Sequence, residues 1–366
     1  MKVLFFLLDG ETNASSHQRV LQYFPLLRRS GIEPYASRPV PEPVYQRFVE
    51  TSGGDTRDKA VFYSLFLACR LVDVLRADRF DVVVIQRDLF PFGPPVMERL
   101  LMRRNPRLVY DTDDATYLRP AFTPNTPFQR LRRFGKVAEV VSNARWVSAA
   151  AEPIAAWARQ YNSNVSVVPM AVDLAEYDRV RRPPRRDDRL VLGWSGTPGG
   201  LAYLRSLAPV LRDLSRKHPI VVRVISGGYR RASVPGVDVD ARPWRAGTAL
   251  QEMKAFDIGL VPLDDSPFEQ AKFPFKLLQY LALGVPAVSA RVGVATSVIA
   301  PLRNGMLASS HAEWHEALES LIVDADLRRR LGEAGRATVA ASYTLERVGP
   351  LLVDGLCRAA APNNRL

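Results

Sequence analysis

The sequence predicts an α/β protein with two doubly wound parallel sheets, each forming one domain. The chain has 366 residues, which is more than a single hydrophobic core usually serves. Short apolar segments rich in β-branched residues alternate with amphipathic ones, the pattern of strands separated by crossover helices. A break rich in proline and arginine divides this alternation into two similar halves.

The first half, residues 1–178, begins with an apolar segment at Lys2–Leu8. This segment is short and ends at Asp9 without a small-residue cleavage site, so we interpret it as a buried strand and not as a signal peptide. A helix is predicted over Ser16–Ser30, and Gly31 ends it. The other strands of this half are predicted at Asp81–Gln86, Arg107–Asp111 and Val165–Val168.

The division is predicted at residues 179–189, where Pro183 and Pro184 lie in a run of charged residues that offers nothing apolar to bury. Residues 190–343 form the second domain, and residues 344–366 form a C-terminal helix. Strands are predicted at Leu190–Gly193, Ile220–Ile225, Ile258–Pro262 and Ala287–Ala290, and helices at Leu201–Lys217, Thr248–Ala255 and Phe275–Leu283. Ligands of such folds bind at the carboxyl ends of the strands, so we expect the active site in a cleft between the domains.

Composition and charge limit the function. Cys69 and Cys357 are the only cysteines, too few for a disulfide framework or a thiolate metal site, which favours a reducing cytoplasm. No uncharged apolar stretch reaches the length of a membrane span. The net charge of +12 indicates attraction to nucleic acid, anionic lipid or a phosphorylated substrate. No RNA-binding motif or interleaving of basic and aromatic residues supports nucleic acid, so we expect no nucleic-acid partner.

The most informative segment runs from Ile258 to Ala290, where a buried strand leads through a polar loop into a helix that Pro274 opens. The first backbone N–H groups of this helix, near Phe275 and Lys276, lack partners within the helix and attract an anion. Lys272 and Lys276 add positive charge. A diphosphate suits this position, whereas two solvated lysines beside an ordinary helix start are the alternative.

The same segment resembles the signature of retaining GT-B glycosyltransferases of family 4 (glycosyltransferase group 1). In that family a strand reading D-I-G-L-x-P leads into a helix ending E-A-M-A-x-G-x-P-V, and residues 257–262 and 279–286 correspond to these stretches. The resemblance extends to Asn304-Gly305 and to a helix from Leu327 to Tyr343. It implies two Rossmann-like domains, a C-terminal helix crossing back to the first, and transfer of a sugar from a nucleoside diphosphate sugar to a hydroxyl without a metal ion or other cofactor.

The resemblance also implies roles on the donor side. It places Gly196 and Thr197 near the diphosphate and Pro243 and Trp244 at the nucleotide base, although core packing is an alternative for Trp244. Gln279 stands where the family has a glutamate that accepts the ribose hydroxyls, and an amide can keep that role.

The sequence departs from the family at a second glutamate, which touches the donor sugar and is replaced by Ala271, and at a loop glycine replaced by Pro274. A non-catalytic sugar-nucleotide-binding module is therefore the alternative to an enzyme. In an enzyme, Lys276 is catalytic, because it stabilises the diphosphate that leaves as the glycosidic bond breaks.

Acidic residues follow the strand that ends at Asp111 in the first half. Asp111 and Asp113 form a D-x-D pattern, which binds metal ions in a different glycosyltransferase fold, and carboxylates at a strand end also cap turns. The resemblance places Asp113 beside the transferred sugar, where it orients a hydroxyl or stabilises developing positive charge. We therefore predict a catalytic role for Asp113 and no metal site.

The resemblance places the acceptor at the loop after the first strand. Ser15 and Ser16 lead into the next helix, where one serine caps it in the simplest interpretation. Arg19, one turn further, can reach an acceptor phosphate. Basic residues also gather over 99–136, and a basic amphipathic helix binds anionic lipid, whereas a solvated helix face explains them equally well. We expect a cytoplasmic protein with peripheral contact to the inner face of the membrane and an acceptor that is a polysaccharide, a glycolipid or another glycoconjugate.

Overall fold

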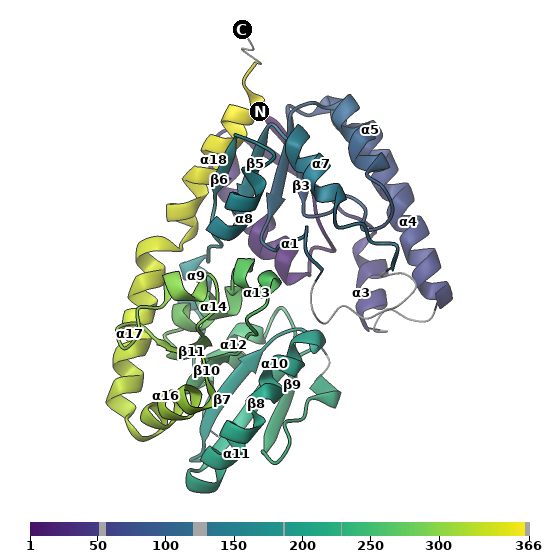
Figure 1. Ribbon diagram of the computed structural model, residues 1–366. Coiled ribbons are helices and arrows are strands. Elements are labelled where there is room, and N and C mark those ends of the chain that lie inside the picture. Colours follow the sequence, from purple (N-terminus) through teal and green to yellow (C-terminus); the bar gives the residue numbers. More distant parts are fainter. Residues whose placement is uncertain (51–55, 120–129, 186, 228, 363–366) are drawn as a thin grey trace. The chain divides into compact units, whose positions relative to one another are not determined.

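The computed structural model describes residues 1–50, 56–119, 130–185, 187–227 and 229–362. The chain divides into unit 1, made of Met1–Ala171 and Val348–Leu366, and unit 2, made of Val172–Arg347 (Figure 1). Each unit contains one six-stranded sheet, and the paired strands in both sheets are parallel. The prediction of two doubly wound parallel sheets is confirmed.

The sheet of unit 1 has the strand order β2-β1-β3-β4-β5-β6. Its strands are β1 (Lys2–Phe6), β2 (Glu33–Ser37), β3 (Val82–Gln86), β4 (Leu108–Thr112), β5 (Trp146–Ala149) and β6 (Val165–Val167). All residues of β3 and β4 are buried, as expected for central strands of a sheet that is covered on both faces. The strand order reverses between β1 and β3, so the loops after these two strands diverge and leave room for a ligand.

The first predicted helix, Ser16–Ser30, is wrong in its length, because the chain there forms three pieces: α1 (Ala14–Arg19), η1 (Leu21–Tyr23) and α2 (Phe24–Arg29). Pro25 lies in the first turn of α2, and in a continuous helix its ring would clash with the carbonyl four residues earlier. The other helical segments up to residue 171 are α3 (Glu42–Glu50), α4 (Thr56–Leu75), η2 (Ala77–Arg79), α5 (Val96–Arg104), α7 (Lys136–Asn143) and α8 (Glu152–Ala158).

The sheet of unit 2 has the order β12-β11-β10-β7-β8-β9. Its strands are β7 (Leu190–Ser195), β8 (Ile220–Ser226), β9 (Val239–Pro243), β10 (Ile258–Val261), β11 (Ala287–Ala290) and β12 (Met306–Ala308). The order reverses between β7 and β10. The carboxyl ends of these two strands therefore form the switch point of unit 2, where ligands of such sheets bind.

The helices of unit 2 differ from the prediction mainly where a proline intervenes. The helix expected over Leu201–Lys217 ends at Ser206 and restarts at Ala208, because Pro209 occupies the first turn of the second piece. The helical segments are α9 (Leu174–Asp178), η3 (Pro198–Gly200), α10 (Leu201–Ser206), α11 (Ala208–Lys217), η4 (Tyr229–Arg231), α12 (Ala249–Lys254), α13 (Pro267–Ala271), α14 (Phe275–Ala282), α15 (Ala295–Val298), α16 (His311–Val323) and α17 (Ala325–Ser342).

Residues 179–189, the expected linker, group with unit 2 and are fastened to it. Arg182 and Arg185 each donate to Asp257 Oδ1 at 2.6 Å. Asp257 Oδ2 accepts from the backbone N–H of Val191 on β7 at 2.8 Å. The division between the units falls earlier than expected, between residues 171 and 172.

Helix α18 (Leu345–Ala360) begins in unit 2 and continues in unit 1. Two of its glycines allow a close approach to unit 1, because a Cβ on Gly349 would lie 2.5 Å from Leu26 and one on Gly355 would lie 2.2 Å from Trp146. A larger residue at either position would separate α18 from the part of unit 1 that it covers.

Candidate functional site

A cluster of residues lies at the switch point of unit 2, after β7. The N–H of Ser195, the last residue of β7, donates to the hydroxyl of Tyr280 on α14 at 2.8 Å. Directly afterwards the chain reaches Gly196, whose N–H donates to the carbonyl of Ile225 on β8 at 3.0 Å. The first bond holds the loop after β7 against helix α14, and the second holds it against strand β8.

Lys276, in the first turn of α14, directs its ammonium group at this loop. Nζ lies 4.7 Å from the centre of the Trp194 ring, and a Cβ on Gly196 would come within 2.9 Å of Nζ, so a side chain there would crowd the lysine. Within the described ranges, Nζ has no hydrogen-bond acceptor or carboxylate partner. A cation–π contact contributes only about 0.5–2 kcal/mol, which does not replace a counter-ion.

The electrostatics of Lys276 follow from this environment. Burial, together with the smaller effect of the nearby charge of Lys272, lowers the pKa of the half-buried lysine to about 7, and Glu269 opposes this shift only weakly. An ammonium group that has lost water without gaining a partner gains most from a bound anion. This group is therefore suited to hold a phosphate oxygen.

The backbone at the start of α14 supplies fewer free donors than the sequence predicted. The N–H of Phe275 is already bonded to the carbonyl of Phe273 at 2.9 Å. The N–H of Lys276 donates to no residue that the structure describes, and Pro274 provides no side-chain cap. Of the two predicted amides, that of Lys276 is the one available to an anion.

Glu269 on α13 is a buried acid that the sequence did not single out. Its Oε1 accepts a hydrogen bond from the hydroxyl of Tyr203 at 2.8 Å. Its Oε2 is buried and accepts none within the described part of the chain, and Lys272 Nζ lies 4.0 Å away. Trp194 Nε1 and Asp264 Oδ1 are buried without partners in the same way. Buried polar atoms are rarely left unpaired in a folded protein, so these three atoms of unit 2 are available to a ligand; Tyr23 Oη and Arg70 Nε in unit 1 share the property.

The remaining predicted donor residues lie around this cluster. Thr197 is exposed in the loop after β7. Pro243 ends β9, the outermost strand, and Trp244 follows it half-buried, so Trp244 is not a core residue. Gln279 lies one turn beyond Lys276 on α14 and hydrogen-bonds Tyr177, whose phenol pKa is raised by burial and only partly lowered by this bond.

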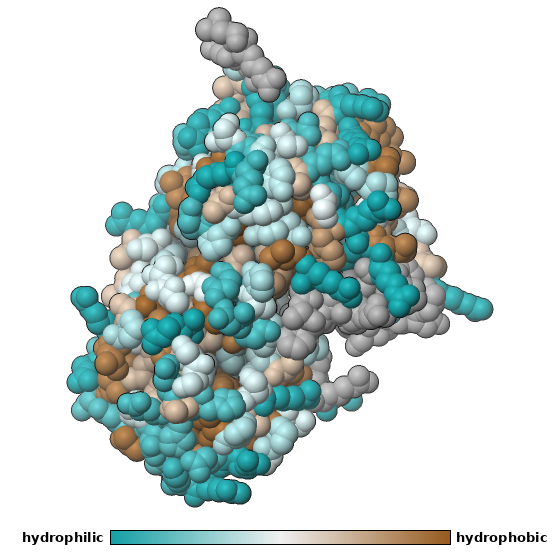
Figure 2. All heavy atoms as spheres, in the orientation of Figure 1, coloured by the Kyte–Doolittle hydropathy of each residue, from teal (hydrophilic) through white to brown (hydrophobic). Residues whose placement is uncertain are grey.

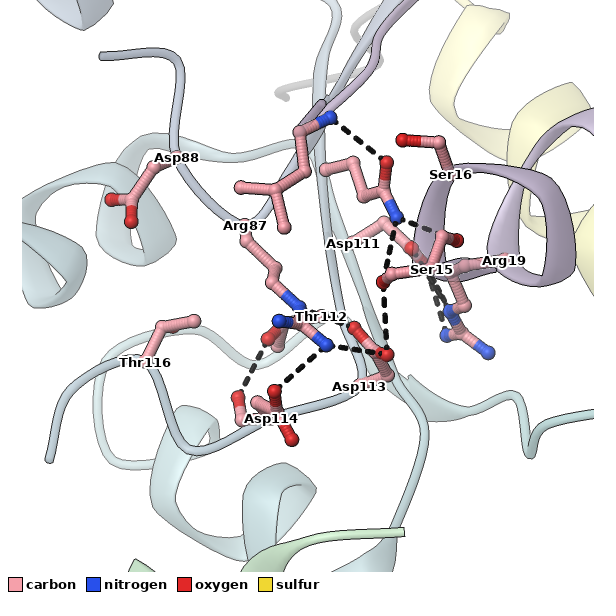
Figure 3. A network of polar contacts seen from close by, with 12 residues as sticks. Ser15, Ser16, Arg19, Arg87, Asp88, Asp111, Thr112, Asp113, Asp114 and Thr116 are labelled. Atoms are coloured by element: carbon pink, nitrogen blue, oxygen red, sulfur yellow. Dashed lines mark hydrogen bonds and ion pairs between the residues drawn. The ribbon is translucent and has the colours of Figure 1, made fainter. Parts of the chain in front are cut away.

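Unit 1 has a second polar cluster, which is organised by Arg87 (Figure 3). Arg87 follows β3 and has a φ of 61°, in the left-handed region that non-glycine residues rarely adopt. Its Nε and Nη2 donate to the two carboxylate oxygens of Asp113 at 2.6 Å each, and Nη2 also lies 2.7 Å from Asp114. Backbone strain of this kind persists where the surrounding structure enforces it, often at functional sites.

The ion pair with Arg87 keeps Asp113 charged. Burial raises the pKa of Asp113, but the charge and hydrogen bonds of Arg87 outweigh it, so the pKa is lowered overall. Ser15 Oγ also donates to Asp113 Oδ2 at 3.3 Å. Asp113 is therefore an acceptor at neutral pH and not a proton donor.

The three residues predicted for the acceptor side have different surroundings. The N-cap of α1 is Asn13 and neither serine, since its side chain accepts from the N–H groups of Ser15 and Ser16. Ser15 reaches Asp113, as described, whereas Ser16 is fully buried and bonds the backbone of Asp9.

Arg19 is 4% exposed and fully engaged inside unit 1. Its Nε and Nη2 bond Asp111 at 2.8–3.1 Å, Nη2 also donates to Ser148, and Nη1 donates to the carbonyl of Val168 at 2.6 Å. This arrangement favours a structural role. A phosphate contact for Arg19 stays a prediction that the geometry does not support.

The carboxylates of the D-x-D pattern face arginines. Asp111 is paired with Arg19, and Asp113 and Asp114 are paired with Arg87. Within the described ranges, no three side chains of histidine, cysteine, aspartate or glutamate come together as a metal site.

A pocket in unit 2 lies near the amino ends of the strands, away from the Lys276 cluster. Arginines and acids line it in pairs: Arg223 and Arg242 bind Asp240, and Arg189 binds Asp187. Because its charges compensate one another, this pocket selects neither anions nor cations, and we assign the functional site to the switch points instead.

Part of the chain is similar to known proteins in sequence. Residues 205–352 match a family model described as glycosyl transferase-like. The D-inositol 3-phosphate glycosyltransferase of Stackebrandtia nassauensis is 33% identical over 210 residues, which cover 49% of this chain and 45% of that protein. The chain therefore matches less than half the length of this relative.

Solved structures share the fold over nearly the whole chain. HepE of Anabaena, solved with UDP and glucose, has a TM-score of 0.68 at 15% identity and covers 98% of this chain and 99% of its own. A glycosyltransferase from Rickettsia africae has a TM-score of 0.69 at 10% identity, with 98% of both chains covered. Sucrose-phosphate synthase of Thermosynechococcus elongatus has a TM-score of 0.66 at 12% identity, with 97% and 98% covered.

Two units with parallel six-stranded sheets, each with a polar cluster at its switch point, define a protein of the GT-B fold class. The sequence matches then specify the class further. Over residues 205–352 the chain is similar in sequence to glycosyl transferase-like proteins.

Proposed function

We propose that the protein transfers a glycosyl unit from a nucleoside diphosphate sugar to a hydroxyl acceptor, with retention of anomeric configuration, as a metal-independent family 4 enzyme. The observation that carries this proposal is the ammonium of Lys276, which lies at the Trp194 ring and Gly196 at the switch point of unit 2 and has no ionic or hydrogen-bonding partner among the described residues. A site that offers a desolvated cation and a free helix amide suits a diphosphate.

In the proposed reaction the bond between the anomeric carbon and the β-phosphate oxygen breaks, and the diphosphate leaves with an additional negative charge. The acceptor oxygen forms the new bond on the same face of the sugar and gives its proton to the departing phosphate oxygen. Lys276 stabilises the charge that develops on the leaving group, without the need for a divalent ion.

The other residues of the two clusters bind and orient the substrates in this proposal. Gln279 accepts hydrogen bonds from the ribose hydroxyls, and Trp244 contacts the nucleotide base. Glu269, two residues before the buried Ala271, offers its Oε2, which accepts no hydrogen bond within the described part of the chain, to a hydroxyl of the donor sugar. Asp113, kept ionised by Arg87, orients a hydroxyl of the transferred sugar or stabilises developing positive charge.

A thermal-shift screen of UDP, GDP, dTDP and ADP sugars, each with and without EDTA, tests the donor class. We expect one base to raise the Tm and EDTA to leave the shift unchanged. UDP is the first candidate, because HepE of Anabaena was solved with UDP and with UDP-glucose. The stabilising sugar nucleotide is then incubated with the protein, and release of the nucleoside diphosphate is measured.

The outcomes of this screen separate the alternatives. Stabilisation without any release of nucleoside diphosphate, even by slow hydrolysis, would favour a non-catalytic sugar-nucleotide-binding module. The reason to consider this alternative is Ala271, which replaces the glutamate that touches the donor sugar in the family. Stabilisation that disappears with EDTA would contradict metal independence, and no stabilisation by any of the four would contradict the donor site itself.

The affinity for a nucleoside diphosphate sugar should depend on pH through Lys276. Its pKa of about 7 in the free protein means that the lysine is mostly neutral above pH 7 and must take up a proton as the anion binds. We therefore expect the affinity to fall by up to about tenfold per pH unit above pH 7 and to level off below it. Isothermal titration calorimetry with UDP-glucose measures this, because the donor diphosphate does not titrate in that range. Lys276→Met should remove the dependence, and an unchanged profile in that variant would show that another group titrates.

A further inference from the structure

Helix α4 has an exposed face without a single charged side chain from residue 60 to residue 75. The exposed residues of this stretch are Ala60, Val61, Ser64, Leu67, Ala68, Leu71, Val72 and Leu75. Val61 is 69% exposed, and Leu67, Leu71, Val72 and Leu75 are 40–45% exposed. A helix on the surface of a water-soluble domain normally carries charged residues on this face.

The two charged residues between positions 60 and 75 lie on the inner side of α4 instead. Arg70 is completely buried and donates to the side chain and carbonyl of Ser37 at 2.7 and 2.9 Å, and Asp73 accepts from the same serine at 2.6 Å. Phe62, Phe66 and Val74 share this buried side. The apolar outer face is therefore not needed for the core of unit 1, which favours a partner for it outside the chain.

The surroundings of this face are basic. Between residues 76 and 104 the exposed charged residues are five arginines and two aspartates: Arg76, Asp78, Arg79, Asp81, Arg99, Arg103 and Arg104. Arg99 is paired with Glu139 at 2.5 Å, and Arg104 lies 3.9 Å from Asp78. These residues belong to η2, α5 and the segments beside them, and α5 packs against α4. Figure 1 shows the two helices along one edge of unit 1, and hydrophobic side chains gather at that edge in Figure 2.

We propose that the outer face of α4 and the arginines around α5 form a surface that docks on an anionic lipid bilayer. The apolar residues enter the boundary between headgroups and acyl chains, and the arginines contact the lipid phosphates. A second copy of the chain fits this face less well, because a two-fold contact would bring the two sets of arginines together. The net charge of +12 also favours an anionic partner.

This surface shares only the first arginines, Arg99, Arg103 and Arg104, with the basic stretch 99–136 that the sequence singled out. In that stretch Lys136 is buried and bonded to Glu98 at 2.9 Å, and Arg132 is bonded to Asp88 at 3.1 Å. The docking surface is shifted towards α4, where apolar residues are exposed. Among the described helices, none is long and apolar enough to cross a membrane.

Cosedimentation with vesicles tests the proposal, with phosphatidylcholine alone compared with phosphatidylcholine and phosphatidylglycerol. We expect the protein to bind the anionic vesicles at low ionic strength and to be released by salt. Leu71→Glu should weaken binding at least about tenfold, because it puts a charge into the apolar face and repels anionic lipid. Val323→Glu is the matched control, since Val323 is a 67% exposed apolar residue of unit 2 and the charge change is identical.

Reversing Arg103 and Arg104 to glutamate should also weaken binding, by about fivefold or more for each residue. Failure of the wild-type protein to bind anionic vesicles would overturn the proposal, as would equal losses in Leu71→Glu and Val323→Glu. A concentration-dependent dimer that Leu71→Glu dissociates, with vesicle binding unchanged, would assign the face to a second copy. The proposal is independent of the donor site. The Leu71→Glu variant should therefore keep the wild-type Tm and the wild-type affinity for the sugar nucleotide.

Discussion

Replacing Lys276 by methionine is expected to lower kcat/KM for the sugar nucleotide by about 10²–10³-fold. Methionine keeps a flexible stem against the Trp194 ring but removes the one cation that is directed at the loop after β7 without a partner among the described residues. Both the ground-state diphosphate and the leaving group lose this charge, so KM should rise and kcat should fall. Steady-state kinetics with the donor identified by thermal shift measures both.

Lys272→Met is the matched control for this variant. The Lys272 side chain is 37% exposed and lies 4.0 Å from Glu269, so solvent and the carboxylate already screen its charge. We expect a loss below about tenfold in kcat/KM. Equal losses in the two variants would indicate that α14 attracts the donor through general positive charge, and an active Lys276→Met protein would contradict the role of this lysine in catalysis.

Replacing Asp113 by asparagine should lower kcat by about 10²–10³-fold and change the donor affinity by less than about threefold. Asparagine keeps the shape and one acceptor oxygen but has no charge with which to stabilise positive charge on the sugar. Arg87 retains Asp114 as a partner, so the fold should persist with a modest decrease in Tm. Kinetics at saturating donor, together with calorimetric titration of the donor, separate the two quantities.

The neighbouring acid provides the control for Asp113. Asp114→Asn removes a negative charge from the same guanidinium and leaves Asp113 in place, so we expect kcat to stay within about fivefold of the wild-type value. Were both variants to lose activity and Tm equally, the aspartates would serve to hold Arg87 in its strained conformation and not to act on the sugar.

The sequence predicted most of the strands that are central in each sheet because they are apolar throughout, as β3 is. It missed the edge strands β2, β9 and β12, and also β5, which lies inside its sheet. Strands β2 and β9 carry polar residues and prolines, as in Glu33–Ser37 and Val239–Pro243, whereas β5 and β12 are only four and three residues long. Both wrong helices contain a proline near their middle, where the restart of a helix cannot be distinguished from its continuation by apolar spacing alone.

The candidate site was predictable to the extent that it depends on local sequence. Lys276 and Gly196 lie together because each directly follows a recognisable strand or helix boundary. Arg87 and Glu269 were missed because their roles depend on partners elsewhere in the fold: Arg87 pairs with Asp113, 26 residues away, and Glu269 with Tyr203, 66 residues away. A glycine at position 87 would have indicated a positive φ, because glycine adopts it without strain. The residue is an arginine, so nothing in the sequence points to this backbone conformation.

The path of the chain through the two units determines which of them can be isolated. Unit 2 is one uninterrupted stretch, Val172–Arg347, which contains its whole sheet and Lys276, so a single excised polypeptide retains every element of the donor cluster. Unit 1 is assembled from two distant stretches, and cutting the chain before Val348 would uncover Trp146 and Leu26. The proposed nucleotide site can therefore be studied on a fragment, whereas the proposed acceptor side requires the full polypeptide.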